Sequence, residues 1–151
     1  MPTIKGRPEG INWLVPYLTV ADAEASLDFY HRAFGFESEG PVAGPDGGIM
    51  HASMKYQGAT VIMFSPEGAM GDQKMRTPAH MGVELPINLY VYCPDVDALA
   101  AQAREAGAVI LQGPEDMFWG DRWVGLRDPD GYYWSFATNI GPFDASRIPQ
   151  G

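Results

Sequence analysis

The pattern of hydrophobic and polar positions divides the chain into two similar halves. In the first half, residues 11–20 (INWLVPYLTV) are rich in β-branched and aromatic side chains and predict a strand. Residues 22–34 predict a helix, because Asp22 is a suitable N-cap and Gly35 a suitable C-terminal stop. Two further strands are expected near residues 49–56 and 59–65.

The same order of elements returns in the second half. Residues 87–93 predict a strand and residues 95–106 a helix that is capped by Asp95. Two more strands follow, joined by the turn Asp128-Pro-Asp-Gly131, and a short extra strand fits at about 107–112. The two paired strands are expected near residues 122–127 and 132–138.

This order indicates a duplicated β-α-β-β unit. Gly58 and Gly131, the two turn glycines, are separated by the same offset as Val15 and Asn88. The sequence therefore predicts an α+β fold, in which two curled mixed sheets surround a shared interior. We expect one domain over residues 11–140, made of repeats at about 11–66 and 86–140.

The segments outside the repeats have their own character. The inter-module loop, residues 66–86, carries Met70, Met75 and Met81, and a loop of this length is typical of a mobile linker or of a lid over a ligand. The tail, residues 141–151, is polar and is expected to be frayed or to pack on a partner subunit.

Charge and composition narrow the possible partners. The 151 residues carry a formal net charge of −9, which argues against binding to nucleic acid or to an anionic membrane surface. No apolar run approaches the roughly 20 residues that span a bilayer, and residues 1–10 hold no segment of signal-peptide length. We therefore expect a cytoplasmic protein whose ligand is small and either neutral or cationic. The single cysteine, Cys93, excludes an intramolecular disulfide and is expected to be an inert buried thiol.

Six short motifs occur in an order that resembles a known superfamily. They are Val15–Asp22, Leu27–Phe36, Ile49–Ala52, Phe118–Arg122, Leu126–Gly131 and Trp134–Thr138. Together they resemble the vicinal oxygen chelate superfamily, also called the glyoxalase/bleomycin resistance/dioxygenase superfamily, and the third and fourth resemble its PhnB-like subgroup. The resemblance implies two β-α-β-β-β modules whose curled sheets form a cleft, usually in a homodimer.

The resemblance also implies where a divalent metal would bind. Metal-using members place His or Glu at four inward-facing positions, which fall here on Val15, Asn88, Ser135 and either Ile62 or Met63. None of these residues is a histidine or a carboxylate, and a catalytic ion needs at least about three nitrogen or oxygen donors. We therefore expect no metal and no other cofactor, unless the register of one strand differs by a residue.

Polar and aromatic residues remain as candidates for the cleft. His51 is expected either to act as a hydrogen-bonding group or general base, or to be satisfied by a backbone carbonyl or by Asp121. Trp119 is suited to stacking on a planar ligand, and Arg122 either binds a carboxylate or carbonyl group or braces its loop together with Asp121. The complete set of expected ligand-binding residues is Tyr17, His51, Asn88, Tyr90, Trp119, Arg122 and Ser135.

Three classes of function are consistent with these features. The first is a metal-independent binding protein of the antibiotic-resistance type, which holds a small aromatic or cationic molecule. The second is a lyase, isomerase or dioxygenase that uses either a divalent metal or His51 as a base. The third is a structural or regulatory dimer without a ligand. The acidic net charge, the absence of histidine and carboxylate at the metal positions, and the aromatic residues on the strands favour the first class.

Overall fold

A computed structural model describes residues 3–4 and 6–151 of the chain. Positions 1, 2 and 5 lie outside the described residues, and they belong to the N-terminal segment in which no signal-length apolar run is expected. Two short strands, β1 (Thr3–Ile4) and β2 (Arg7–Pro8), pair with each other ahead of the first module. Within the described residues, no helix combines the length and apolar character that crossing a membrane requires.

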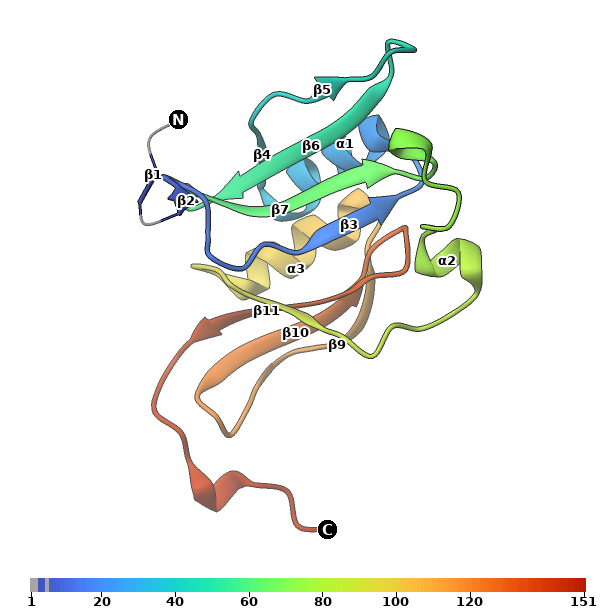
Figure 1. The fold of residues 1–151 in the computed structure, drawn as a ribbon. Helices are drawn as coiled ribbons and strands as arrows, with labels where there is room; N and C mark the ends of the chain where they lie inside the picture. Colours follow the sequence, from blue (N-terminus) through green and yellow to red (C-terminus); the bar gives the residue numbers. More distant parts are fainter. Residues whose placement is uncertain (1–2, 5) are drawn as a thin grey trace.

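The first module is a mixed sheet with one long helix (Figure 1). Strands β3 and β7 are parallel, β6 is antiparallel to β7, and the short strands β4 and β5 both pair with β6. The elements are β3 (Tyr17–Val20), α1 (Ala23–Phe34), β4 (Glu37–Ser38), β5 (Val42–Ala43), β6 (Ile49–Tyr56) and β7 (Ala59–Pro66).

The second module repeats this plan. Strands β8 and β11 are parallel, and β10 and β9 follow in antiparallel order. The elements are β8 (Leu89–Tyr92), α3 (Val96–Ala106), β9 (Val109–Asp116), β10 (Asp121–Arg127) and β11 (Tyr133–Asn139). The α+β fold with two curled mixed sheets is confirmed.

The observed elements differ from the expectation in the first strand, in the extra strand, in the inter-module loop and in the tail. The first strand begins at Tyr17 rather than at residue 11, because the chain before Pro16 makes only an isolated bridge from Ile11 to Thr60. The strand expected at about 107–112 is longer and spans Val109–Asp116. The inter-module loop contains the one-turn elements η1 (Ala69–Gly71) and α2 (Pro78–Met81), and the tail contains η2 (Ala145–Arg147).

Both long helices begin and end at the residues that the sequence predicts. The Asp22 carboxylate accepts a hydrogen bond from the Ala25 amide at 3.0 Å, and the Asp95 carboxylate accepts one from Ala98 at 3.0 Å. Each helix stops at a glycine with positive φ, +74° at Gly35 and +113° at Gly107. The ends of both helices are therefore defined by hydrogen bonds and backbone angles within a few residues of each end.

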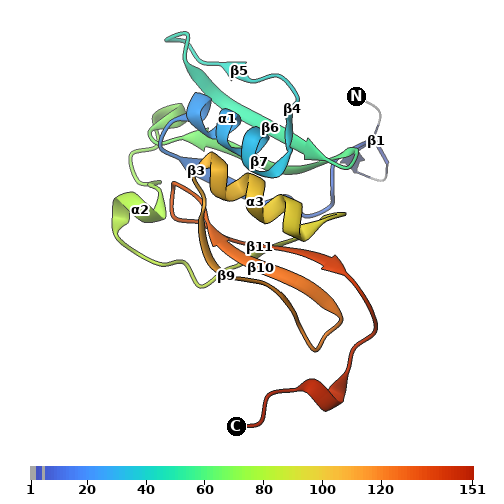
Figure 2. The same ribbon diagram turned by 180° about the vertical axis from the view of Figure 1, so that it is seen from behind.

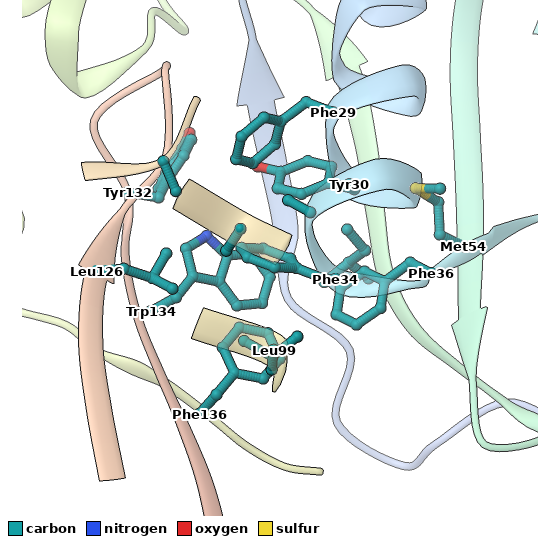
Figure 3. Close-up of a cluster of buried hydrophobic side chains, with 14 of the residues drawn as sticks. Phe29, Tyr30, Phe34, Phe36, Met54, Leu99, Leu126, Tyr132, Trp134 and Phe136 are labelled. Atoms are coloured by element: carbon teal, nitrogen blue, oxygen red, sulfur yellow. The ribbon is translucent and has the colours of Figure 1, made fainter. Parts of the chain in front are cut away.

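The shared core lies on the helix side of both sheets. Helices α1 and α3 lie behind the strands in Figure 1 and in front of them in Figure 2. Figure 3 shows Tyr30 and Phe34 of α1 among the side chains of the second sheet, where Phe34 lies 5.0 Å from Trp134 and 4.5 Å from Phe136 between ring centroids. Loss of a fully buried aromatic such as Trp134 costs about 3–5 kcal/mol. The buried residues of both modules thus form one shared core, and helices α1 and α3 cover the apolar faces of the sheets that contribute to it.

The turn between β10 and β11 connects the second module to the first through hydrogen bonds. Asp128, which is 3% exposed, accepts hydrogen bonds from the Tyr30 hydroxyl at 2.6 Å and from the Trp134 indole at 2.9 Å. The Tyr132 hydroxyl donates to the Thr19 carbonyl at 2.8 Å and accepts from the Thr19 amide at 3.1 Å. The turn between β10 and β11 therefore belongs to the contact between modules as well as to its own hairpin.

Candidate functional site

The candidate site lies on the faces of the sheets that the helices leave open. Successive residues of a strand point to opposite faces. In β7, Ile62 is buried at 1% exposure on the helix side, whereas Met63 is half-buried and pairs with the exposed Tyr17. Of the two candidates for the first-module metal position, Met63 therefore shares the open face with Tyr17.

A chain of hydrogen bonds crosses the open face of the first module. The Tyr17 hydroxyl lies 2.7 Å from His51 Nδ1 and 2.6 Å from Ser65 Oγ, and His51 Nε2 lies 3.1 Å from Ser53 Oγ. The alternative partners expected for His51, a backbone carbonyl or Asp121, are wrong, since its two ring nitrogens face Tyr17 and Ser53. A cavity of about 440 Å³ adjoins this network. Its lining includes Tyr17, Thr19, Ser65, Met70 and Met75.

A larger groove lies between the two modules. It has a volume of about 750 Å³ and is bounded by the segment before β3, by β7 and by β8. Leu14, Pro16 and Val61 contribute from the first module, and Asn88, Tyr90 and Tyr92 contribute from the second. Trp134 also lines the groove. None of the described residues that line it carries a charge, and a concave apolar surface of this size suits a small organic ligand.

A second hydrogen-bond network supports the β8 wall of this groove. The hydroxyls of Tyr90 and Tyr92 donate to the same oxygen of Asp121, at 2.7 and 2.8 Å. The Asn139 amide donates to the other oxygen at 3.0 Å, and the Trp119 indole donates to the Tyr90 hydroxyl at 3.0 Å. Asp121 is only 1% exposed, so this carboxylate depends on its protein partners for solvation.

The hydrogen bonds determine the protonation states of this network. Burial alone would raise the pKa of Asp121, but the hydrogen bonds from Asn139, Tyr90 and Tyr92 outweigh it and hold the pKa below its ordinary value. Burial raises the pKa of Tyr90 to about 12. The hydrogen bond to Asp121 raises the pKa of Tyr92. Near neutral pH the site therefore contains one carboxylate and two neutral phenols.

Asn88 lines a further cavity of the second module, and Ser135 is paired in the sheet with Gly125, which also lines it. This cavity has a volume of about 430 Å³ and is lined in part by Asn88, Trp123, Gly125 and Tyr133. Ser135 pairs with Gly125 in the sheet and is fully buried, and its hydroxyl has no hydrogen-bond partner among the described residues. The Trp123 ring occupies the space beside Gly125, where a Cβ would lie 2.8 Å from the ring. A side chain at position 125 would therefore displace this tryptophan.

Arg122 lies apart from the other expected ligand-binding residues. Its guanidinium forms ion pairs with Asp97 of α3 at 2.8 Å and with Asp116 of β9 at 3.0 Å. These partners hold its side chain on the helix side of the sheet. The structure shows Arg122 in the bracing role. Its side chain holds α3 and β9 to its own strand through the carboxylates of Asp97 and Asp116, and not through backbone groups.

The metal positions do not fit a divalent ion. Val15 and Met63 of the first module offer no nitrogen or oxygen ligand in their side chains, and Asn88 and Ser135 of the second offer only neutral oxygen donors. Across residues 3–4 and 6–151, no three side chains of His, Cys, Asp or Glu are grouped as a metal site requires.

The structure adds Tyr92, Asp121, Ser53 and Ser65 to the expected residues. Tyr92 could have been found from its sequence, because it lies two positions after Tyr90 and therefore shares its face of the strand. Asp121 and Ser65 depend on contacts between distant strands. No local pattern in the sequence marks these two residues as partners of tyrosine hydroxyls.

Comparison with known proteins relates this fold to a family. The sequence model of the Glyoxalase/Bleomycin resistance protein/Dioxygenase superfamily matches residues 10–136. The chain is 36% identical over 143 residues to Mb0911c of Mycobacterium bovis, covering 91% of this chain and 93% of that protein. TioX from Micromonospora sp. ML1 has a similar crystal structure, with a TM-score of 0.65 at 27% identity over 85% of this chain and 99% of TioX. TnmS3, an antibiotic binding protein from Streptomyces sp. CB03234, shares the fold with a TM-score of 0.57 at 23% identity over 85% of this chain and 97% of TnmS3.

Proposed function

Because the chain belongs to the Glyoxalase/Bleomycin resistance protein/Dioxygenase superfamily, we propose that it binds a small aromatic molecule in the groove between its modules, without a metal. The observation that carries this proposal is the groove of about 750 Å³, whose described lining is uncharged and largely apolar. Aromatic walls from Tyr90 and Tyr92 suit a flat ligand. The fold shared with TnmS3 is compatible with this use, since that protein is an antibiotic binding protein.

The test is a titration with a neutral flat probe, 1-aminoanthracene, followed by probe emission and by tryptophan quenching. Leu14 and Ile87 line the groove and are 84% and 58% exposed, so the double variant Leu14→Glu/Ile87→Glu changes the groove with little effect on folding. We expect saturable binding that weakens by about tenfold or more in this variant, since each charge must be desolvated by the bound probe.

The matched control is Val42→Glu, which places the same charge on an exposed apolar residue of β5 outside the groove. Its affinity should stay within about twofold of the wild type, since surface substitutions away from a site have small effects. Absence of saturable binding would contradict the proposal and favour a structural or regulatory protein without a ligand. Equal affinities in all three proteins would also contradict it, because the probe would then bind outside the groove.

A second candidate function is acid–base catalysis at the open face of the first module. The observation that favours it is the Tyr17 hydroxyl, which lies within hydrogen-bond distance of both His51 Nδ1 and Ser65 Oγ beside a cavity. Tyr17 lines the cavity and His51 does not, so a proton from a bound substrate would pass to His51 through the Tyr17 hydroxyl. If this candidate is correct, His51→Gln abolishes turnover of a bound substrate while its Kd changes little.

We also propose that the chain forms a homodimer. Both open sheet faces carry exposed aromatic side chains, including Tyr17, Tyr90 and Tyr92, which a second subunit would cover in part. Light scattering that gives the mass of one chain at micromolar concentration would contradict this. The cytoplasmic location and membership of the PhnB-like subgroup stay predictions from the sequence.

A further inference from the structure

Two tyrosine rings form a corner in the wall of the groove. The ring centroids of Tyr90 and Tyr92 lie 5.5 Å apart at an interplanar angle of 61°, and the residues are 42% and 57% exposed. Both residues line the groove between the modules. The face of an aromatic ring is its negative side, so two inclined rings create a position that attracts a cation.

A buried carboxylate increases the attraction of the corner between Tyr90 and Tyr92 for a cation. Asp121 accepts a hydrogen bond from each tyrosine hydroxyl, at 2.7 and 2.8 Å, and is itself 1% exposed. A phenol that donates to a carboxylate is polarised, and its ring becomes richer in electrons. The negative charge of Asp121 adds a direct attraction for a cation, because the protein around it screens less than water does.

The same hydrogen bonds make this end of the groove unsuitable for an anion. The protons of both tyrosine hydroxyls are directed to Asp121, and the Trp119 indole N–H is directed to the Tyr90 hydroxyl. The Asn139 amide also donates to Asp121. These donors are already used, and none of the described groove residues is a lysine or an arginine. The net charge of −9 acts in the same direction.

From this arrangement we infer that the ligand of the groove carries a positive charge, as a quaternary or protonated amine, which lies in the corner between Tyr90 and Tyr92. The inference rests on the proposed function, because it specifies the chemical class of the ligand in the same groove. The remainder of the ligand extends along the apolar wall formed by Leu14, Pro16 and Val61.

The experiment compares two probes of equal shape, phenyltrimethylammonium and tert-butylbenzene, which differ in charge alone. Both are titrated into the full chain, with the Trp119 indole N–H resonance as a reporter beside Tyr90. We expect the cation to bind about tenfold more tightly than the neutral probe, which is the order of a desolvated cation–π interaction. Added salt should reduce this ratio, and the affinity of the neutral probe should not fall with it.

Three variants test whether the preference for the cation depends on the corner between Tyr90 and Tyr92. Tyr92→Leu removes one ring together with its hydrogen bond to Asp121 and should reduce the ratio of the two affinities by about fivefold, more than the other two variants. Tyr92→Phe keeps the ring but removes its hydrogen bond to Asp121, and Asp121→Asn removes the charge, so each should reduce the ratio about threefold. Tyr92 is 57% exposed, so its variants test the inference even if Asp121→Asn fails to fold. The matched control, Tyr133→Leu, removes a tyrosine that lines the neighbouring cavity and should leave the ratio unchanged.

The outcomes separate this inference from the proposed function. If 1-aminoanthracene binds the groove but the cation binds no better than tert-butylbenzene, the inference is overturned and the proposed function stands. A preference for the cation that is undiminished in Tyr92→Leu also overturns the inference, because the charge is then recognised elsewhere. If 1-aminoanthracene does not bind at all, the proposed function fails first.

Discussion

The hairpin turns of the two modules lie at equivalent positions in the fold, but they differ in length and in the contacts that they make. In the first module, β6 and β7 are joined by Gln57 and Gly58 alone, at φ angles of +52° and +84°, which is the tight two-residue turn that suits strand twist. In the second module, β10 and β11 are joined by the five residues from Asp128 to Tyr132. This longer turn contacts the other module through Tyr30, Thr19 and Ala21.

The difference shows how two repeats of one plan become a single unit. The first turn is determined by local backbone geometry, and its two residues only connect β6 to β7. The second uses buried polar groups, which must all be paired to avoid a desolvation cost. We therefore expect the attachment between modules to depend strongly on the second turn and little on the first.

The largest expected effect is that of Asp128→Ala. This change leaves the Tyr30 hydroxyl, the Trp134 indole and the amides of Asp130 and Tyr132 without their acceptor. Each buried donor left unpaired costs about 1–3 kcal/mol, so the free energy of unfolding should fall by about 3 kcal/mol or more. Urea denaturation followed by tryptophan fluorescence measures it.

The matched control is Gln57→Gly in the turn of the first module. Glycine adopts the positive φ of this position without strain, so the free energy of unfolding should change by less than about 1 kcal/mol. Equal losses of stability in Asp128→Ala and Gln57→Gly would show that the two turns do not differ as described.

Tyr132→Phe should have the next largest effect. The hydroxyl that it removes bonds both the amide and the carbonyl of Thr19, which is 8% exposed. The loss should be about 1–3 kcal/mol in the free energy of unfolding. Tyr56→Phe removes a hydroxyl for which no hydrogen bond is seen among the described residues, and it should cost less than about 0.5 kcal/mol in the same measurement.

A smaller, pH-dependent effect is expected for Asp130→Asn. Burial raises the pKa of Asp130 to about 6, and the nearby charge of Asp128 adds to this against the hydrogen bond from the Ala21 amide. The folded chain therefore holds a proton that the unfolded chain has already released, and wild-type stability from this residue is lost as the pH rises from about 4 to about 6. Solvent screens this half-buried group, so the change should be below about 1 kcal/mol.

The variant Asp130→Asn lacks this titration. Its free energy of unfolding minus that of the wild type should rise between pH 4 and pH 6 and then become constant. Urea denaturation at a series of pH values measures this difference, and titrations elsewhere in the chain cancel in it. A difference that is flat over this range, or that falls, would contradict the assignment.

The smallest effect is expected for Arg122→Ala. Its partners Asp97 and Asp116 are 59% and 46% exposed, so water and salt screen both ion pairs. We expect a slight loss of stability that decreases with added salt. The Kd of 1-aminoanthracene should stay within about twofold of the wild type, because Arg122 lies on the helix side of its sheet. A larger rise in Kd would indicate that Arg122 does contribute to binding of the probe.

Much of the fold could be predicted because its signals are local. Asp22 and Gly35 define the ends of α1, and the alternation of polar and apolar residues in β6 gives the buried face of that strand. The candidate site was predicted only in part. Tyr17, His51 and Tyr90 lie on the open faces of the sheets, whereas Arg122 faces α3.

The sequence by itself determined the elements, the duplication and the residue types available for chemistry. Caps, turn residues and strand alternation act over a few positions, so they operate in any context. Only the tertiary structure decided that the helices cover the shared core and that Asp121 serves Tyr90 and Tyr92. These contacts join residues about 30 positions apart in different strands, and the register of the sheet that joins them depends on packing of the whole module.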